Sequence, residues 1–169
     1  MANFASLRLC TYSREESCDH RIMEVSMTHE YATLLHRWFD EVWNQKKAGT
    51  IHEMMADDVL IHGLSGPGEQ PLQGPAEFER FHSSFLAAFP DIHVEVNDVV
   101  TEQDKLAGRF TVTGTQMGDL PQMPATGKKV LFTGSGVCRI KDGKFTEVWN
   151  EIDFSKMQYD LAPDTPDVA

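Results

Sequence analysis

The sequence predicts an α+β fold, in which a cone-shaped, curved antiparallel sheet is packed by N-terminal helices around an apolar cavity. Apolar residues recur mainly at helical spacing before Pro90 and alternate with a period of two after it. Helices followed by several long strands are typical of α+β folds. Glycines within the strand segments, such as Gly108 and Gly136, indicate bulges or bends that curve the sheet.

The first two helices are expected near the start of this pattern. Apolar residues between 31 and 43 form one face of the first helix, with Thr28 as its N-cap and Gly49 beyond its end. The segment TIHE at 50–53 is typical of a capping box, so it predicts a short second helix.

The remaining elements follow in order. A short strand at 58–64 and a third helix, which begins at Pro75 and ends before Pro90, precede the main sheet. The KDGK segment at 141–144 predicts a hairpin turn, and a short final helix is expected at 154–161. The long strands are expected at 91–100, 106–116, 129–140 and 145–153.

These elements place one domain at 27–162, between an N-terminal extension at 1–26 and a C-terminal tail at 163–169. Lys and Arg number 15 against 26 Asp and Glu, and the net charge of -11 argues against a nucleic-acid partner. No segment approaches the roughly twenty apolar residues of a membrane span, so no membrane partner is expected.

The cysteines bear on compartment and metal binding. Cys10, Cys18 and Cys138 lack the paired spacing of a disulfide framework or a zinc site. This absence predicts a cytoplasmic protein without a bound metal. The glycine-rich segment at 63–68 lacks the strand–turn–helix context of a phosphate loop, so no cofactor is expected.

The last strand offers the first candidate for chemistry. Val148, Asn150 and Ile152 alternate with charged and aromatic residues, so this set is expected to face the cavity. Across the hairpin, Asn150 should lie opposite Ser135 or Gly136, depending on the register of the turn. Asn150 then either contacts a ligand or satisfies backbone groups at a bulge.

Two further side chains could move a proton. Asp153 ends the last strand and could act as a general base at the cavity mouth, although its place before the final helix favours an N-cap. His62 could carry a proton in the cavity or be a hydrogen-bonded core residue. The residues expected to line a substrate pocket are Trp38, Phe81, Phe110, Ser135 and Val148.

Several stretches, in this order and spacing, resemble the SnoaL-like polyketide cyclase (ester cyclase) family of the nuclear transport factor 2 fold. They are RWFDEVWNQKKAGTIHEMMADDVLIHG, GPAEFERFHSSFLAAFPDIHVEV, GTQMGDLPQMPATGKKVLFTG and RIKDGKFTEVWNEIDF, which together span about residues 30–160. The resemblance implies an α+β cone with an apolar cavity, assembled through the sheet as a homodimer or homotetramer.

The resemblance also implies a reaction: cofactor-free ring closure by aldol condensation, begun by a carboxylate that removes a proton next to a carbonyl. The family's catalytic aspartate falls at Asn150, and its histidine partner falls near Gly136. An amide has no basic lone pair of useful pKa. Asn150 could instead donate a hydrogen bond to a developing oxyanion, a contribution on the order of 3 kcal/mol.

Three functions follow from these observations. The first is an enzyme that cyclises or isomerises a small apolar carbonyl compound, with Asp153 or His62 as base and Asn150 as oxyanion donor. The second is an epoxide hydrolase or dehydratase, which would need inward carboxylates held by a group such as Arg109, although strand alternation places Arg109 outside. The third is a non-catalytic module for dimerisation or for binding a small apolar molecule.

Overall fold

The computed structural model describes residues 31–66, 68–120 and 123–162. The chain is helical from residue 31 and continues directly into the π-helix η1 (Trp38–Asn44). The other elements are α2 (Gly49–Met54), β1 (Met55–His62), β2 (Leu72–Gln73), α3 (Gly74–Ala88), β3 (His93–Glu102), β4 (Lys105–Thr115), β5 (Lys129–Lys141), β6 (Lys144–Ile152) and α4 (Phe154–Leu161).

The described strands form one open sheet of six strands in the order β2-β1-β6-β5-β4-β3. The predicted α+β class is confirmed, but the sheet is mixed rather than wholly antiparallel. β1 runs parallel to β6, with Ile61 opposite Val148, because β1 joins the sheet beside the last strand instead of through a hairpin. The short β2, which pairs with β1, lies between the strand predicted at 58–64 and the helix predicted from Pro75, where no strand was predicted.

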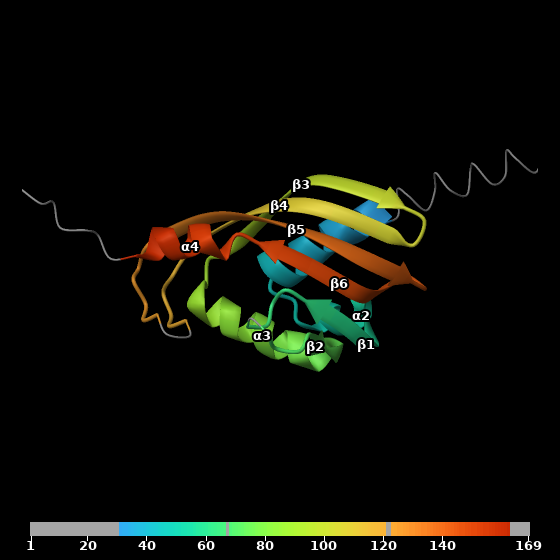
Figure 1. The fold of residues 1–169 in the computed structure, drawn as a ribbon, viewed down its shortest axis with the longest axis horizontal. Helices are drawn as coiled ribbons and strands as arrows, with labels where there is room; N and C mark the ends of the chain where they lie inside the picture. The colour runs from blue at the N-terminus through green and yellow to red at the C-terminus, as the bar shows by residue number, and fades with distance from the viewer. Residues whose placement is uncertain (1–30, 67, 121–122, 163–169) are drawn as a thin grey trace, which may run out of the picture.

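The helices cover one side of the curved sheet. Figure 1 shows the helix that leads into η1 and the helix α3 on the same side of β3–β6, with α4 at the end of the sheet. Buried apolar side chains fill the space between these layers, among them Val42, Ile51, Phe89, Leu106 and Phe132. Burial of these side chains is the main stabilising term of the fold.

The β5–β6 hairpin and the last helix agree with their predicted positions. Asp142 and Gly143 both have positive φ, 52° and 73°, as the central residues of a type I′ turn require. β5 and β6 pair along their length, and a register shift lies between Arg139 and Ile140. α4 spans the predicted 154–161.

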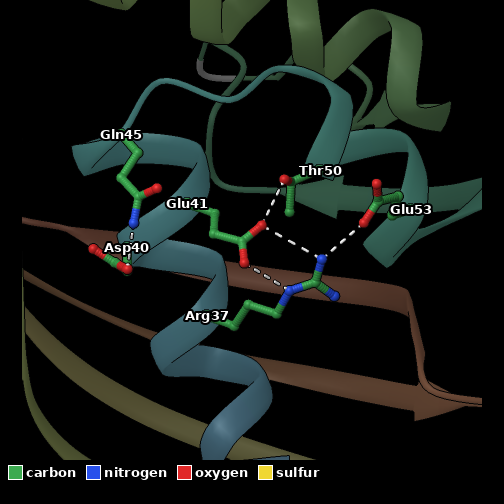
Figure 2. A network of polar contacts seen from close by, with 6 residues as sticks. All are labelled: Arg37, Asp40, Glu41, Gln45, Thr50 and Glu53. Carbon is green, nitrogen blue, oxygen red and sulfur yellow. Dashed lines mark hydrogen bonds and ion pairs between the residues drawn. The ribbon is translucent and has the colours of Figure 1, made fainter.

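The capping box predicted at 50–53 is wrong, although a short helix does form there. The Thr50 hydroxyl donates to Glu41 Oε2 at 2.8 Å, and Glu53 Oε2 pairs with Arg37 Nη2 at 2.7 Å, as Figure 2 shows. The Thr50 and Glu53 side chains therefore bond to the preceding helix and do not cap the first turn of α2. The N-cap residue of α2 is Ala48, which makes no side-chain hydrogen bond. Arg37 Nε also donates to Glu41 Oε1 at 3.0 Å, and this hydrogen bond, followed by the one from Thr50, holds the pKa of the Glu41 carboxyl below its ordinary value.

The end of the first helix also differs from prediction. The helix widens into η1, and Gln45 N donates to Asp40 O at 2.8 Å, the i→i−5 spacing of a π-helix. The residue with positive φ after this helix is Lys46, at 59°. Gly49 is the first residue of α2 and does not terminate the first helix. The predicted cap at Thr28 lies outside the described residues.

The predicted flanks at 1–26 and 163–169 also lie outside the described residues. In the part of the chain that the structure describes, no helix is long and apolar enough to cross a membrane.

Candidate functional site

An apolar cavity of about 80 Å³ lies between the sheet and the helices. Four residues expected to line a substrate pocket line this cavity: Trp38, Phe81, Phe110 and Val148. They come from η1, α3, β4 and β6, so the cavity draws its wall from both layers. That a ligand contacts these four residues remains a prediction.

Aromatic rings make up much of the wall. The ring centroids of Trp38 and Phe78 are 5.2 Å apart, and those of Phe39 and Phe110 are 4.7 Å apart. Such spacings are typical of packed aromatic pairs. The rings occupy much of the cone, which explains the small free volume, and a larger ligand would require them to move.

Ser135 does not line the cavity, contrary to expectation. Gly136 and Cys138 face inward on β5, so the alternation of side chains turns Ser135 outward, where it is exposed. It lies beside Arg109 on the outer face of the sheet. Arg109 is outside, as expected, and pairs there with Asp98 at 2.6 Å.

Asn150 lines the cavity opposite Gly136, one of the two positions predicted for its partner. Its Nδ2 donates to the backbone oxygen of His62 at 3.0 Å. The chain at Gly63 (φ +82°) passes so close to β6 that a Cβ there would lie 2.0 Å from Asn150 O. This close approach brings the end of β1 within reach of the Asn150 amide.

The His62 imidazole lies outside the cavity, so a role as proton carrier inside it is not supported. Ile61 points into the cavity, and its neighbour His62 therefore points to the opposite face. There, His62 Nε2 lies 3.2 Å from Glu147 Oε1, and the ring is parallel to Trp149 at a centroid distance of 5.4 Å. Arg139 contacts both Glu147 and Trp149.

Asp153 is the N-cap of α4, the alternative that its position favoured. Its Oδ1 accepts a hydrogen bond from Lys156 N at 2.9 Å. The side chain is exposed and does not line the apolar cavity, so a role as the cavity's general base is not supported. Instead it borders a shallow polar hollow on the outer face, with Arg109 and Glu151.

The inner wall offers little acid–base chemistry. Among the described residues that line the cavity, Cys138 carries the one titratable side chain whose pKa is shifted, and burial raises the pKa of its thiol to about 12. The thiol therefore keeps its proton at neutral pH. No carboxylate or imidazole is among these lining residues.

A buried histidine lies close behind the wall. His82 Nε2 lies 2.9 Å from Val42 O, and its ring packs against Trp43 at 4.9 Å. Burial lowers the pKa of His82. His82 is therefore a packing residue of α3 with a satisfied hydrogen bond.

The chain is similar to proteins of one family. The family model described as SnoaL-like polyketide cyclase matches residues 33–161. No curated protein matches the chain.

Solved structures resemble it as well. AclR from Streptomyces galilaeus, a proposed hydroxylase, is 26% identical with a TM-score of 0.70, over 83% of this chain and 87% of AclR. IdmH from Streptomyces antibioticus, a proposed polyketide cyclase, is 26% identical with a TM-score of 0.68, over 77% of this chain and 96% of IdmH. A proposed SnoaL-like cyclase from Jannaschia sp. CCS1 is 22% identical with a TM-score of 0.71, over 80% and 94% of the two chains, and shows the shared fold.

Proposed function

Because this chain belongs to the SnoaL-like polyketide cyclase family, we propose that its cavity binds a small, largely apolar molecule. The observation that carries the proposal is the lining itself, which is aromatic and aliphatic apart from the Asn150 amide and the sulfur-bearing side chains of Met55 and Cys138. Burial of apolar surface then supplies the affinity, at roughly 25 cal/mol per Å².

Proton abstraction by a cavity side chain has no candidate base among the described residues. Asn150 stands where the resemblance places the family's catalytic aspartate, and an amide is not basic. The Cys138 thiol is protonated because its pKa is about 12. Asp153 and His62 lie outside the cavity. These placements favour binding over aldol cyclisation or isomerisation begun by a residue of the wall.

Cyclase activity is the second candidate, and the likeness to IdmH over 96% of that chain favours it. In that case the cavity would act by holding a flexible substrate in a folded, reactive conformation. An epoxide hydrolase or dehydratase is less well supported, because Arg109 is turned outward and pairs with Asp98.

A matched pair of variants tests the proposal. Val148 lines the cavity, whereas Val137 on the neighbouring strand is exposed on the outer face. We expect Val148→Phe to weaken the binding of toluene to the full chain at least tenfold, because the added ring occupies the cavity. Val137→Phe should leave the affinity unchanged. The measurement is ligand-observed NMR titration, with thermal unfolding to confirm that both variants fold.

Equal toluene affinity in the two variants would place binding outside the cavity and contradict the proposal. Turnover of an enolisable aromatic ester, lost in Val148→Phe and kept in Val137→Phe, would instead favour the cyclase.

A further inference from the structure

We propose that Asn150 makes the cavity selective for neutral ligands that carry a hydrogen-bond donor, such as a phenolic or enolic hydroxyl, and that this donor binds to Asn150 Oδ1. The inference rests on the proposed function, since it assumes that a ligand enters the cavity. It assigns Asn150 a role opposite to that of an oxyanion donor: the amide oxygen, rather than the amide nitrogen, meets the ligand.

The orientation of the amide follows from its partner. The group beside Asn150 is the backbone oxygen of His62, which can only accept hydrogen bonds, so the amide nitrogen must face it at 3.0 Å. A flipped amide would place two oxygens against each other. The close passage of Gly63 along β6 holds this carbonyl in place.

The amide oxygen is left open. Within the described residues, the single hydrogen bond of the Asn150 side chain is the one from its nitrogen, so Oδ1 accepts none. No buried side-chain nitrogen or oxygen in the same residues lacks a partner, so Oδ1 is accessible and not sealed in the wall. An unpaired but accessible acceptor is ready to bind a donor.

The space near this oxygen is left free by a glycine. Gly136 lies opposite Asn150 on β5 and also lines the cavity. A Cβ added at Gly136 would lie 3.7 Å from Asn150 Oδ1, in ordinary van der Waals contact. Any larger side chain at 136 would occupy part of this space, so the glycine leaves room for a ligand atom.

The surroundings make the contact selective. An apolar ligand that covers Oδ1 without donating removes it from water and leaves it unpaired, which is costly in an apolar site. No cationic side chain lines the cavity, so a carboxylate or phosphate would lack a counter-charge. An ammonium donor would be disfavoured in the same way, because no carboxylate lines the cavity either. Neutral hydroxyl and N–H groups remain.

Phenol, toluene and anisole provide the test, because they are similar in size and differ in polarity. Phenol donates a hydrogen bond, toluene has no polar atom, and anisole has an oxygen that can only accept. Dissociation constants would be measured by NMR titration for the full chain and for Asn150→Leu. We expect the affinity of phenol relative to toluene to fall about tenfold in Asn150→Leu, and that of anisole relative to toluene to stay within about twofold.

A second variant keeps Asn150 and its bond to His62. Gly136→Ala adds a methyl group beside Oδ1, with a small adjustment against Trp149 O at 3.1 Å, and should also lower the preference for phenol. Gly114→Ala is the matched control, because its Cβ meets nothing nearer than 3.5 Å and Gly114 does not line the cavity. This control should leave the phenol-to-toluene ratio unchanged.

The outcomes separate the two proposals. Toluene and phenol could both bind the cavity with the same ratio of dissociation constants in wild type, Asn150→Leu and Gly136→Ala. In that case selection by Asn150 is wrong, while the proposed binding function stands. If anisole rather than phenol loses affinity in Asn150→Leu, the amide acts as a donor and the inference is overturned. If none of the three ligands binds the wild-type chain, the proposed function fails first.

Discussion

At the scale of single residues, polar side chains at the cavity are already committed to partners in the protein. The Asn150 nitrogen bonds to His62 O, and the His82 ring bonds to Val42 O. Each bond satisfies a backbone oxygen that would otherwise be costly to bury. At Asn150, what remains for a ligand is the side-chain oxygen.

His82 makes stability depend on pH. It is 1% exposed, and burial lowers its pKa, so the folded state holds a neutral ring while the unfolded state takes up a proton near the ordinary pKa of about 6.5. The stability that His82 contributes is therefore complete above about pH 6.5 and is lost as pH falls from there toward the lowered folded pKa. We expect the midpoint temperature of thermal unfolding to decrease when the pH is lowered from 7.5 to 5.5.

His82→Gln should reduce this pH dependence, because glutamine can still donate to Val42 O but takes up no proton. His93→Gln is the control, since His93 is exposed. An unchanged slope in His82→Gln would show that another group causes the acid sensitivity.

At the scale of elements, the junction between β6 and α4 defines the end of the cavity. Asp153 caps α4, and the adjacent residues Ile152 and Phe154 both line the cavity. The cap fixes the start of the helix, and with it the position of Phe154. A carboxylate at this junction is therefore explained by helix capping.

Removal of the cap should affect stability more than binding. We expect Asp153→Ala to lower the free energy of unfolding by about 1 kcal/mol, a shift of roughly 2–4 °C in the unfolding midpoint. Asp153→Asn should lose much less, since asparagine also caps helices. Toluene affinity, measured alongside, should stay the same in both variants. Loss of toluene binding in Asp153→Ala, with an unchanged unfolding midpoint, would show that Asp153 acts in the functional site.

At the scale of the whole molecule, the outer face of the sheet carries exposed apolar side chains. Leu131 is 52% exposed and Val137 is 42% exposed, and both point outward from β5, a strand in the interior of the sheet. Exposed apolar groups on such a face fit the expectation of a homodimer or homotetramer formed through the sheet. The net charge of -11 opposes association, so added salt should favour it.

We expect the full chain to be dimeric in 0.15 M salt by light scattering coupled to size exclusion, a condition in which charge repulsion is screened beyond about 8 Å. Leu131→Glu combined with Val137→Glu should give monomers, because each dimer would bury added carboxylates. Met117→Glu is the control, because Met117 is exposed but lies outside the strands, and this variant should remain dimeric. A wild-type monomer would contradict the dimer, and dimers that survive the double change would place the interface elsewhere.

The sequence alone determined the kinds and order of the elements, because the backbone imposes its own periodicity on apolar residues. The β5–β6 hairpin was predicted from the change of period at Pro90 and from the KDGK turn, and the last helix from the segment at 154–161. Alternation along β6 also placed Asn150 on the inner face, and the α+β class followed from the order of helices and strands.

Tertiary structure decided which partners the polar side chains have. The register shift between Arg139 and Ile140 sets Gly136, and not Ser135, opposite Asn150. The Asn150 amide is oriented by His62 O, 88 positions earlier in the chain, through the parallel pairing of β1 with β6. Thr50 likewise bonds to Glu41 on another helix instead of capping its own. Local patterns report backbone periodicity, whereas hydrogen-bond partners depend on segments brought together only by folding.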